Sequence, residues 1–148
     1  MANRMLWRWL SRLSSVLGAI ALFSSAAIAQ TRIYSPITIT PGQTINDKLT
    51  KNDIPTGQGG FARDYVVQLQ AGNQITVDVS STSFDSIVHL IATDGTTIAE
   101  NDDGPDGSTN SLLFTRIAKA GAYIIRVRSF GEAAGGNFTL KVTLLKPQ

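Results

Sequence analysis

The sequence predicts an all-β protein, folded as a two-sheet sandwich of about eight short strands. Apolar and polar residues alternate in successive segments after residue 30, which is the pattern of half-buried strands. Gly, Asn, Asp and Pro separate these segments at intervals of roughly a dozen residues, as expected of a sandwich. Helical periodicity is nearly absent from the same region. We therefore expect one domain with one core and no internal repeat.

The start of the chain, residues 1–29, is typical of a secretory signal peptide. A basic beginning with three arginines is followed by an apolar run at residues 16–23 and by small residues up to Ala29. A membrane anchor is the alternative, but a span needs about 20 apolar residues and this run is shorter and interrupted by serines. We expect cleavage after Ala29 and export to the periplasm or the cell exterior, with no membrane attachment afterwards.

The exported chain is expected to consist of a loose lead-in, residues 30–38, and a sandwich domain at residues 39–146. A first strand is expected at residues 35–40, followed by a polar, Gly-rich connection. Strands at 64–69 and 75–80 come next, on either side of the turn "AGNQ". The residues on the apolar faces of these two strands are Tyr65, Val67, Leu69, Ile75, Val77 and Val79.

The second half of the chain continues the same pattern. Residues 85–92 and 96–99 flank the turn "TDG" and are expected to form a hairpin. Further strands are expected at 111–118, 121–129 and 137–145. In the middle one of these, Tyr123, Ile125 and Val127 alternate with Ile124, Arg126 and Arg128.

The charge of the chain argues against a nucleic-acid partner. The whole sequence has 13 Lys and Arg against 11 Asp and Glu, but three of the arginines lie in the signal segment. The exported part is therefore slightly acidic and offers no basic stripe for nucleic acid. It also has no cysteine, so burial or a bound ion must supply the stability that disulfides often give to exported domains.

Seven motifs follow one another from about residue 39 to residue 144: "PGQTINDKL", "DYVVQLQAGNQITV", "SFDSIVHL", "DGTTIAENDDG", "NS", "AGAYIIRV" and "GNFTLKV". In this order they resemble the bacterial pre-peptidase C-terminal domain, abbreviated PPC. The resemblance implies a jelly-roll-like β-sandwich of the kind found at the end of secreted peptidases and other exported enzymes. Such domains assist secretion or adhere to polymers. The collagen-binding domains of clostridial collagenases are related and bind calcium.

The sequence departs from that family pattern in two respects. No peptidase domain precedes the motifs, so a free-standing module is expected. The acidic lead-in "E-x-N-D", which contributes calcium ligands in the collagenase relatives, is also missing, and only "NDK" at residues 46–48 is similar to it.

The acidic loop "AENDDGPDGSTNS", residues 99–111, is open to two interpretations. It is either a structural turn whose aspartates bond backbone NH groups, which we favour, or a calcium site, since calcium takes six to eight oxygen ligands. An EF-hand is excluded because the spacing puts Gly104 and Leu113 at ligand positions. The candidate calcium ligands are Asp85, Asn101, Asp102, Asp103 and Asp106, with Asn110 as a further amide.

Catalytic constellations are hard to assemble from this sequence, and we expect no enzyme. The sequence has no cysteine to act as a nucleophile, and His89 is its only histidine that could act as a base. Asp85 lies four residues before it on the same strand, roughly 13 Å away, and His89 is expected to face solvent. A carboxylate pair of Glu100 and Glu132 would be needed for a small hydrolase.

A set of apolar residues is expected on the outer faces of the strands, and it is open to two interpretations. The residues either belong to central strands covered on both sides or are scattered singly, which we favour, or they form a docking patch for a partner. These residues are Ile87, Ile91, Leu112, Phe114 and Ile124.

Three functions are therefore in view. The leading hypothesis is an exported, non-catalytic module that assists secretion or binds a polymer or protein partner. The second is a calcium-stabilised domain that binds carbohydrate or peptide at the acidic loop. The third is a secreted hydrolase that uses carboxylates.

Overall fold

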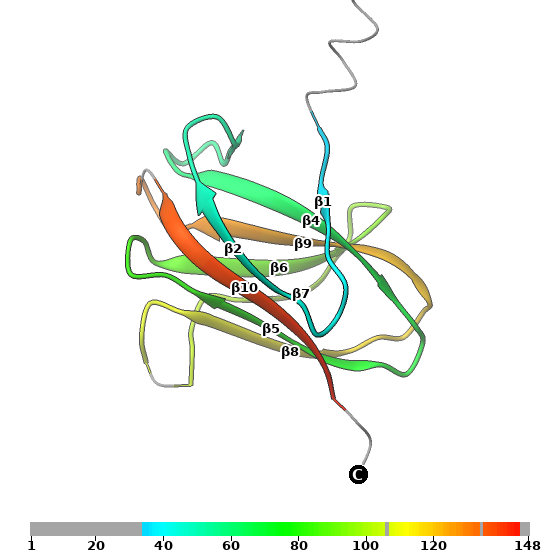
Figure 1. Cartoon of the computed structure of the whole chain (residues 1–148). Coiled ribbons are helices and arrows are strands. Elements are labelled where there is room, and N and C mark those ends of the chain that lie inside the picture. The colour runs from blue at the N-terminus through cyan, green and yellow to red at the C-terminus, as the bar shows by residue number, and fades with distance from the viewer. Residues whose placement is uncertain (1–33, 106, 134, 146–148) are drawn as a thin grey trace, which may run out of the picture. The chain divides into compact units, whose positions relative to one another are not determined.

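Alternating apolar residues pair into ten strands, and these form two stacked sheets (Figure 1). The computed structural model describes residues 34–105, 107–133 and 135–145. The expected signal peptide, residues 30–33 of the lead-in, the candidate ligand Asp106 and residue 146 lie outside the described residues. From Ser35 onward the chain forms one compact unit.

Sheet A has six strands and is antiparallel except for one parallel pair. Five of its strands lie in the order β1-β4-β9-β6-β7, and β3 pairs with β4 beside β1. The parallel pair is β1 with β4. The strands are β1 (Ile37–Thr38), β3 (Ile54–Pro55), β4 (Phe61–Leu69), β6 (Ser86–Ala92), β7 (Thr97–Asn101) and β9 (Gly121–Ser129).

Sheet B has four antiparallel strands in the order β2-β10-β5-β8. They are β2 (Thr44–Leu49), β5 (Gln74–Ser80), β8 (Ser111–Arg116) and β10 (Gly136–Leu145). Figure 1 shows β10 between β2 and β5 in this layer, and β9 between β4 and β6 in the other.

The core lies between the two sheets and consists of the residues that the alternation placed inside. Tyr65, Val67, Ile75, Val77 and Val79 are all fully buried. Each large apolar side chain removed from water contributes about 1.5–3 kcal/mol, so these alternating sets stabilise the sandwich.

Aromatic rings join the two layers inside this core. Phe138 of sheet B meets Tyr65 of sheet A edge to face, with ring centres 6.4 Å apart at 81°. It meets Phe84 in the same way, at 6.1 Å and 76°. Edge-to-face geometry adds about 0.5–1.5 kcal/mol to the burial of each pair.

The sandwich class expected from the sequence is confirmed, and the eight strands of five or more residues agree with the expected number. One expectation was wrong in position. The strand expected at 35–40 contains only the two-residue β1, whereas the segment interpreted as a connection contains β2 and β3. Asp47 explains the error, because it occupies an inward position of β2 and interrupts the apolar alternation.

The hairpin around "TDG" is present: β6 pairs with β7, and Gly95 takes a φ of 87° at the turn. This left-handed conformation favours glycine. The hairpin brings Glu100 of β7 opposite His89 of β6. Within the described residues, no helix has the length and apolar character needed to cross a membrane.

Candidate functional site

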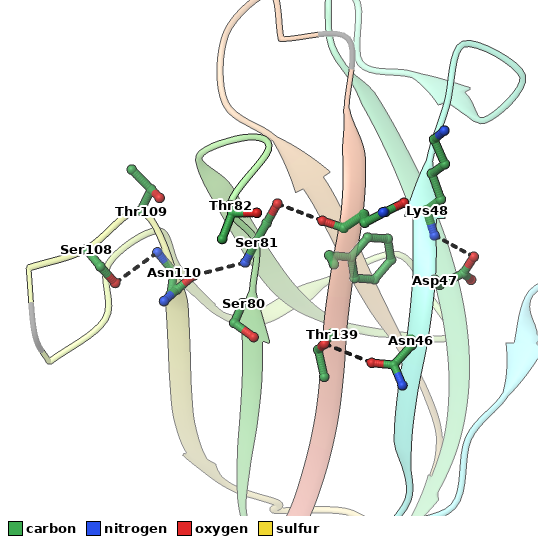
Figure 2. Close-up of a pocket in the computed structure, with 12 residues that line it drawn as sticks. Asn46, Asp47, Lys48, Ser80, Ser81, Thr82, Ser108, Thr109, Asn110 and Thr139 are labelled. Atoms are coloured by element: carbon green, nitrogen blue, oxygen red, sulfur yellow. Dashed lines mark hydrogen bonds between the residues drawn. The ribbon is translucent and has the colours of Figure 1, made fainter.

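A hollow of about 980 Å³ opens at one end of sheet B, where strand ends and loops meet (Figure 2). We call it the sheet B groove. Its lining side chains are polar except for that of Phe138, and only two of them are charged. The lining residues are Asn46, Asp47, Lys48, Ser80, Ser81, Thr82, Ser108, Thr109, Asn110, Asn137, Phe138 and Thr139.

The middle of the groove is held by Ser81, which is 8% exposed. Its hydroxyl donates to the carbonyl of Asn137 at 2.8 Å, and its backbone NH donates to Oδ1 of Asn110 at 3.0 Å. The same hydroxyl accepts the backbone NH of Ser83 at 3.0 Å. These bonds tie the end of β5 to β10 and to the loop before β8, so the groove is fixed before any ligand arrives.

The strand side of the groove presents neutral hydrogen-bonding groups. Thr139 of β10 donates its hydroxyl to Oδ1 of Asn46 on the neighbouring β2, at 3.0 Å. The amide nitrogen of Asn46 points away from this contact, and Thr82 is exposed at the loop side (Figure 2). Hydroxyls and amides at fixed positions suit a polar, uncharged ligand.

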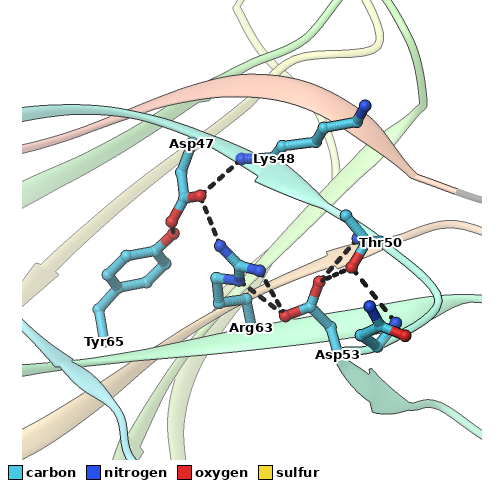
Figure 3. Close-up of polar contacts among 7 residues, drawn as sticks. Asp47, Lys48, Thr50, Asp53, Arg63 and Tyr65 are labelled. Atoms are coloured by element: carbon cyan, nitrogen blue, oxygen red, sulfur yellow. Dashed lines mark hydrogen bonds and ion pairs between the residues drawn. The ribbon is translucent and has the colours of Figure 1, made fainter.

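A polar cluster that includes Asp47 of the groove lining joins β2 of sheet B to β4 of sheet A (Figure 3). Asp47 of β2 accepts the hydroxyl of Tyr65 on β4 at 2.7 Å and also bonds the guanidinium of Arg63. Arg63 bonds the carboxylate of Asp53 as well, at 2.7 Å. Asp53 in turn accepts the backbone NH of Thr50 at 2.7 Å.

The pKa values of this cluster follow from its bonds. Burial acts to raise the pKa of Asp47, but the hydrogen bonds from Arg63 and Tyr65 outweigh it, and the pKa lies below its usual value. Burial and the bond to Asp47 both raise the pKa of Tyr65. Asp47 is therefore held as an anion that three donors satisfy: the side chains of Arg63 and Tyr65 and the backbone NH of Lys48.

The acidic loop is closed by asparagine rather than by aspartate. The side-chain amide of Asn101 donates to the carbonyls of Asp103 at 2.9 Å and Leu112 at 2.8 Å. Its oxygen accepts the backbone NH of Asp103 at 3.3 Å. The amide oxygen of Asn110 is occupied by Ser81, and the side chains of Asp102 and Asp103 are exposed.

The candidate calcium ligands are only partly brought together. Asp85 follows β5 at the start of β6, and its backbone carbonyl accepts the NH of Phe130 at 2.8 Å. In the part of the chain that the structure describes, no three acidic, histidine or cysteine side chains gather closely enough to hold a metal ion. Asp106 lies outside the described residues, so calcium binding stays a prediction.

The expected apolar patch is divided between two sheets. Ile91 and Ile124 are cross-strand partners in sheet A, whereas Leu112 and Phe114 lie on β8 of sheet B. Ile87 is only 6% exposed, because neighbouring structure covers it, so it offers no surface for docking. Phe114 is 60% exposed, next to half-buried Leu112.

His89 faces away from the core, as expected, but it is not solvated. Its side chain is 16% exposed, and Nδ1 lies 3.1 Å from Oε2 of Glu100. From the sequence, only Asp85 on the same strand was a candidate partner for His89. The partner was missed because it lies across the hairpin. Glu100 and Glu132 are both exposed.

The sheet B groove was also missed from the sequence. The segment at 108–110 was considered only as part of the acidic loop, and the serines and threonine at 81–83 were given no role, because these residue types are common in turns. These two polar segments adjoin the ends of β5 and β8, which pair in sheet B. Their composition could have indicated that this end of the sandwich is lined by polar side chains.

Comparison with known proteins confirms the resemblance drawn from the sequence motifs. Residues 62–129 match the family described as bacterial pre-peptidase C-terminal domain, PPC, and this segment runs from β4 through β9. The family is one of non-catalytic accessory domains. Among curated proteins, no sequence matches significantly.

Two solved structures share the fold. The pre-peptidase C-terminal domain of a collagenase from Bacillus anthracis is 16% identical, with a TM-score of 0.56 over 74% of this chain and 95% of that domain. PliG of Aeromonas hydrophila, a periplasmic inhibitor of g-type lysozyme, is 17% identical, with a TM-score of 0.53 over 75% of this chain and 100% of that chain. At these identities the similarity establishes the fold.

Proposed function

We propose that this chain is an exported, non-catalytic module that binds a polar polymer or a protein partner in the sheet B groove. The observation that carries the proposal is the groove itself, a hollow of about 980 Å³ with a nearly neutral hydrogen-bonding lining. The PPC family match supports an accessory role. PliG, which has the same fold, acts on a protein partner and is periplasmic.

The construction of the groove favours binding over chemistry. Its polar atoms are fixed by bonds such as that between Thr139 and Asn46, so little conformational entropy is lost when a ligand is bound. Its only charged side chains are Asp47 and Lys48, and Asp47 is already engaged by Arg63 and Tyr65. The groove therefore offers a neutral glycan or an extended peptide hydrogen-bond donors and acceptors, and no unpaired carboxylate repels them.

The experiment is a pull-down on insoluble polymers, with cellulose, chitin, peptidoglycan and collagen as separate arms. Thr139→Ala and Asn46→Ala should each weaken retention on the binding polymer about fivefold to tenfold, the loss expected for one hydrogen bond of about 1–1.5 kcal/mol.

Thr143→Ala is the matched control, because Thr143 lies on the same face of the same strand outside the groove. It should bind as the wild type does. Equal retention of Thr139→Ala and Thr143→Ala on every polymer that binds the wild type would remove the groove from consideration.

A further inference from the structure

A second hollow, of about 310 Å³, lies on the outer face of sheet A and is independent of the sheet B groove. We call it the sheet A hollow. Three basic side chains line it: His89 from β6, and Arg126 and Arg128 from β9. The rest of its wall is mixed, with apolar side chains such as Ile54 and Ile91 beside the hydroxyl-bearing Thr56 and Thr97.

The register of sheet A arranges charges in one row across this face. Asp64, Arg126, His89 and Glu100 are successive cross-strand partners on β4, β9, β6 and β7. Arg126 donates to both oxygens of Asp64, at 2.7 and 2.8 Å, and His89 contacts Glu100 at 3.1 Å. Within this row each basic group has an acidic neighbour.

Arg128 lies outside that row. Its cross-strand partners are Ala62 on β4 and Ile87 on β6, which are both apolar. Among the described residues, no ion pair of Arg128 is found. It therefore adds a positive charge to the hollow that no carboxylate among the described residues pairs with, and such a charge is costly where it is partly buried.

Two buried nitrogen atoms on this face lack hydrogen-bond partners among the described residues. They are Nε2 of His89 and Nε of Arg128. Nε of arginine can only donate, and an unmet buried donor costs about 1–3 kcal/mol. A ligand that accepts hydrogen bonds would recover this cost.

His89 can take up a proton at this site. Glu100 accepts from Nδ1, so in the neutral ring that nitrogen carries the proton and Nε2 is bare. Burial and the charge of Arg128 lower the pKa of His89, Arg126 on β9 lowers it further, and Glu100 on β7 raises it. Asp64 on β4 faces Arg126 from the other side. An anion beside Arg128 would favour proton uptake at Nε2.

We propose that the sheet A hollow binds a carboxylate group, which accepts a hydrogen bond from Nε of Arg128 and one from the protonated Nε2 of His89. His89 and Arg128 are diagonal neighbours in the register of β6 and β9, within reach of one another through long side chains. The two oxygens of a carboxylate can accept from both donors. The apolar wall at Ile54 and Ile91 suits the carbon atoms that carry the group.

The single histidine makes the proposal directly measurable, because its imidazole signals in an NMR spectrum can belong only to His89. The pKa of His89 is measured in sodium acetate and in sodium chloride of equal ionic strength. Saturating acetate should raise it by about one unit or more, the effect expected of a nearby opposite charge. An unchanged pKa would overturn the proposal.

Two arms establish that the effect belongs to this site. Arg128→Gln should abolish the acetate-dependent change, whereas Arg116→Gln, an exposed arginine on β8 of the other sheet, should retain it. Loss in both variants or in neither would contradict the assignment. Inorganic phosphate should raise the pKa less than acetate, and an equal or larger effect would overturn the preference for a carboxylate.

A wild-type measurement decides the matter if Arg128→Gln fails to fold. Because binding is coupled to proton uptake, acetate should bind several-fold more tightly at pH 5.5 than at pH 7.5. Equal affinities at the two pH values would contradict the proposal. Neither the titration of His89 nor the acetate affinity involves the sheet B groove. The results of these two measurements are therefore independent of the result of the polymer pull-down.

Discussion

Asp47 shows how one residue can stabilise the fold and support the candidate site together. Its side chain is 19% exposed, lines the sheet B groove, and is bonded by groups from β4 of the other sheet. A partly buried carboxylate is costly unless its oxygens are satisfied. Here Arg63 and Tyr65 satisfy it, so the bonds between the sheets depend on its charge.

Replacing Asp47 should therefore destabilise the protein. Asp47→Ala removes a charged acceptor from two side-chain donors and the backbone NH of Lys48, and we expect a loss of about 2–3 kcal/mol in the free energy of unfolding at pH 7, measured by urea denaturation. Asp78→Ala is the control, because Asp78 is an exposed aspartate of β5. It should change the free energy by less than about 0.5 kcal/mol.

The same comparison has a defined pH dependence. The pKa of Asp47 in the folded protein lies below the ordinary value of 3.8. Its stabilisation is therefore fully present above that value and is lost as the pH falls through the lower, folded pKa. The difference between wild type and Asp47→Ala should shrink below about pH 4, and a difference that grows there would disprove the role of the carboxylate.

At the scale of the elements, the acidic loop is organised by its amides. The side-chain amide of Asn101 donates to and accepts from backbone groups at both ends of the loop. The loop links β7 of sheet A to β8 of sheet B. Asp102, its neighbour in the sequence, is exposed. The aspartates were expected to bond backbone NH groups, and the asparagines do so here.

Asn101→Ala should lower the free energy of unfolding by about 1–2 kcal/mol and speed hydrogen exchange at Leu112, whereas Asp102→Ala should leave both unchanged.

Melts of the wild type in calcium and in chelator test the predicted cation site, since a ligand held only by the folded state raises the melting temperature. If calcium binds, that rise should be smaller in Asp102→Ala. A destabilising effect of Asp102→Ala in chelator would contradict the view that amides close the loop.

The success of sequence prediction differed between elements for physical reasons. Strands such as β5 and β9 bury every second side chain, and strict alternation identifies them. β2 carries Asp47 at an inward position, so its alternation is broken and it was interpreted as a connection. The pairing of His89 with Glu100 depends on the register of the β6–β7 hairpin. The turn sequence "TDG" predicted the hairpin, but the residue opposite His89 was not worked out from it.

At the scale of the whole molecule, the core and the sheet B groove share one residue. Phe138 is 3% exposed, packs against Tyr65 and Phe84, and also lines the groove. Its neighbours Asn137 and Thr139 carry the polar groups of the groove floor. The shape of the groove is therefore set by the same packing that holds the two sheets together.

Phe138→Ala should test this dependence. Loss of a buried phenyl ring costs about 3–5 kcal/mol, a large share of the 5–15 kcal/mol that stabilises a typical domain. Phe138→Leu keeps most of the volume and should cost less, and Leu145→Ala, at a 37% exposed site of the same strand, should cost about 0.5 kcal/mol or less.

Polymer retention, measured where each variant remains folded, should fall in Phe138→Leu and stay unchanged in Leu145→Ala, because only the former shifts Asn137 and Thr139. The imidazole signals of His89, on the outer face of sheet A, should stay at their wild-type positions in Phe138→Leu. Changed His89 signals would mean that the two sheets respond as one body, and the groove and the sheet A hollow could then not be treated as independent sites.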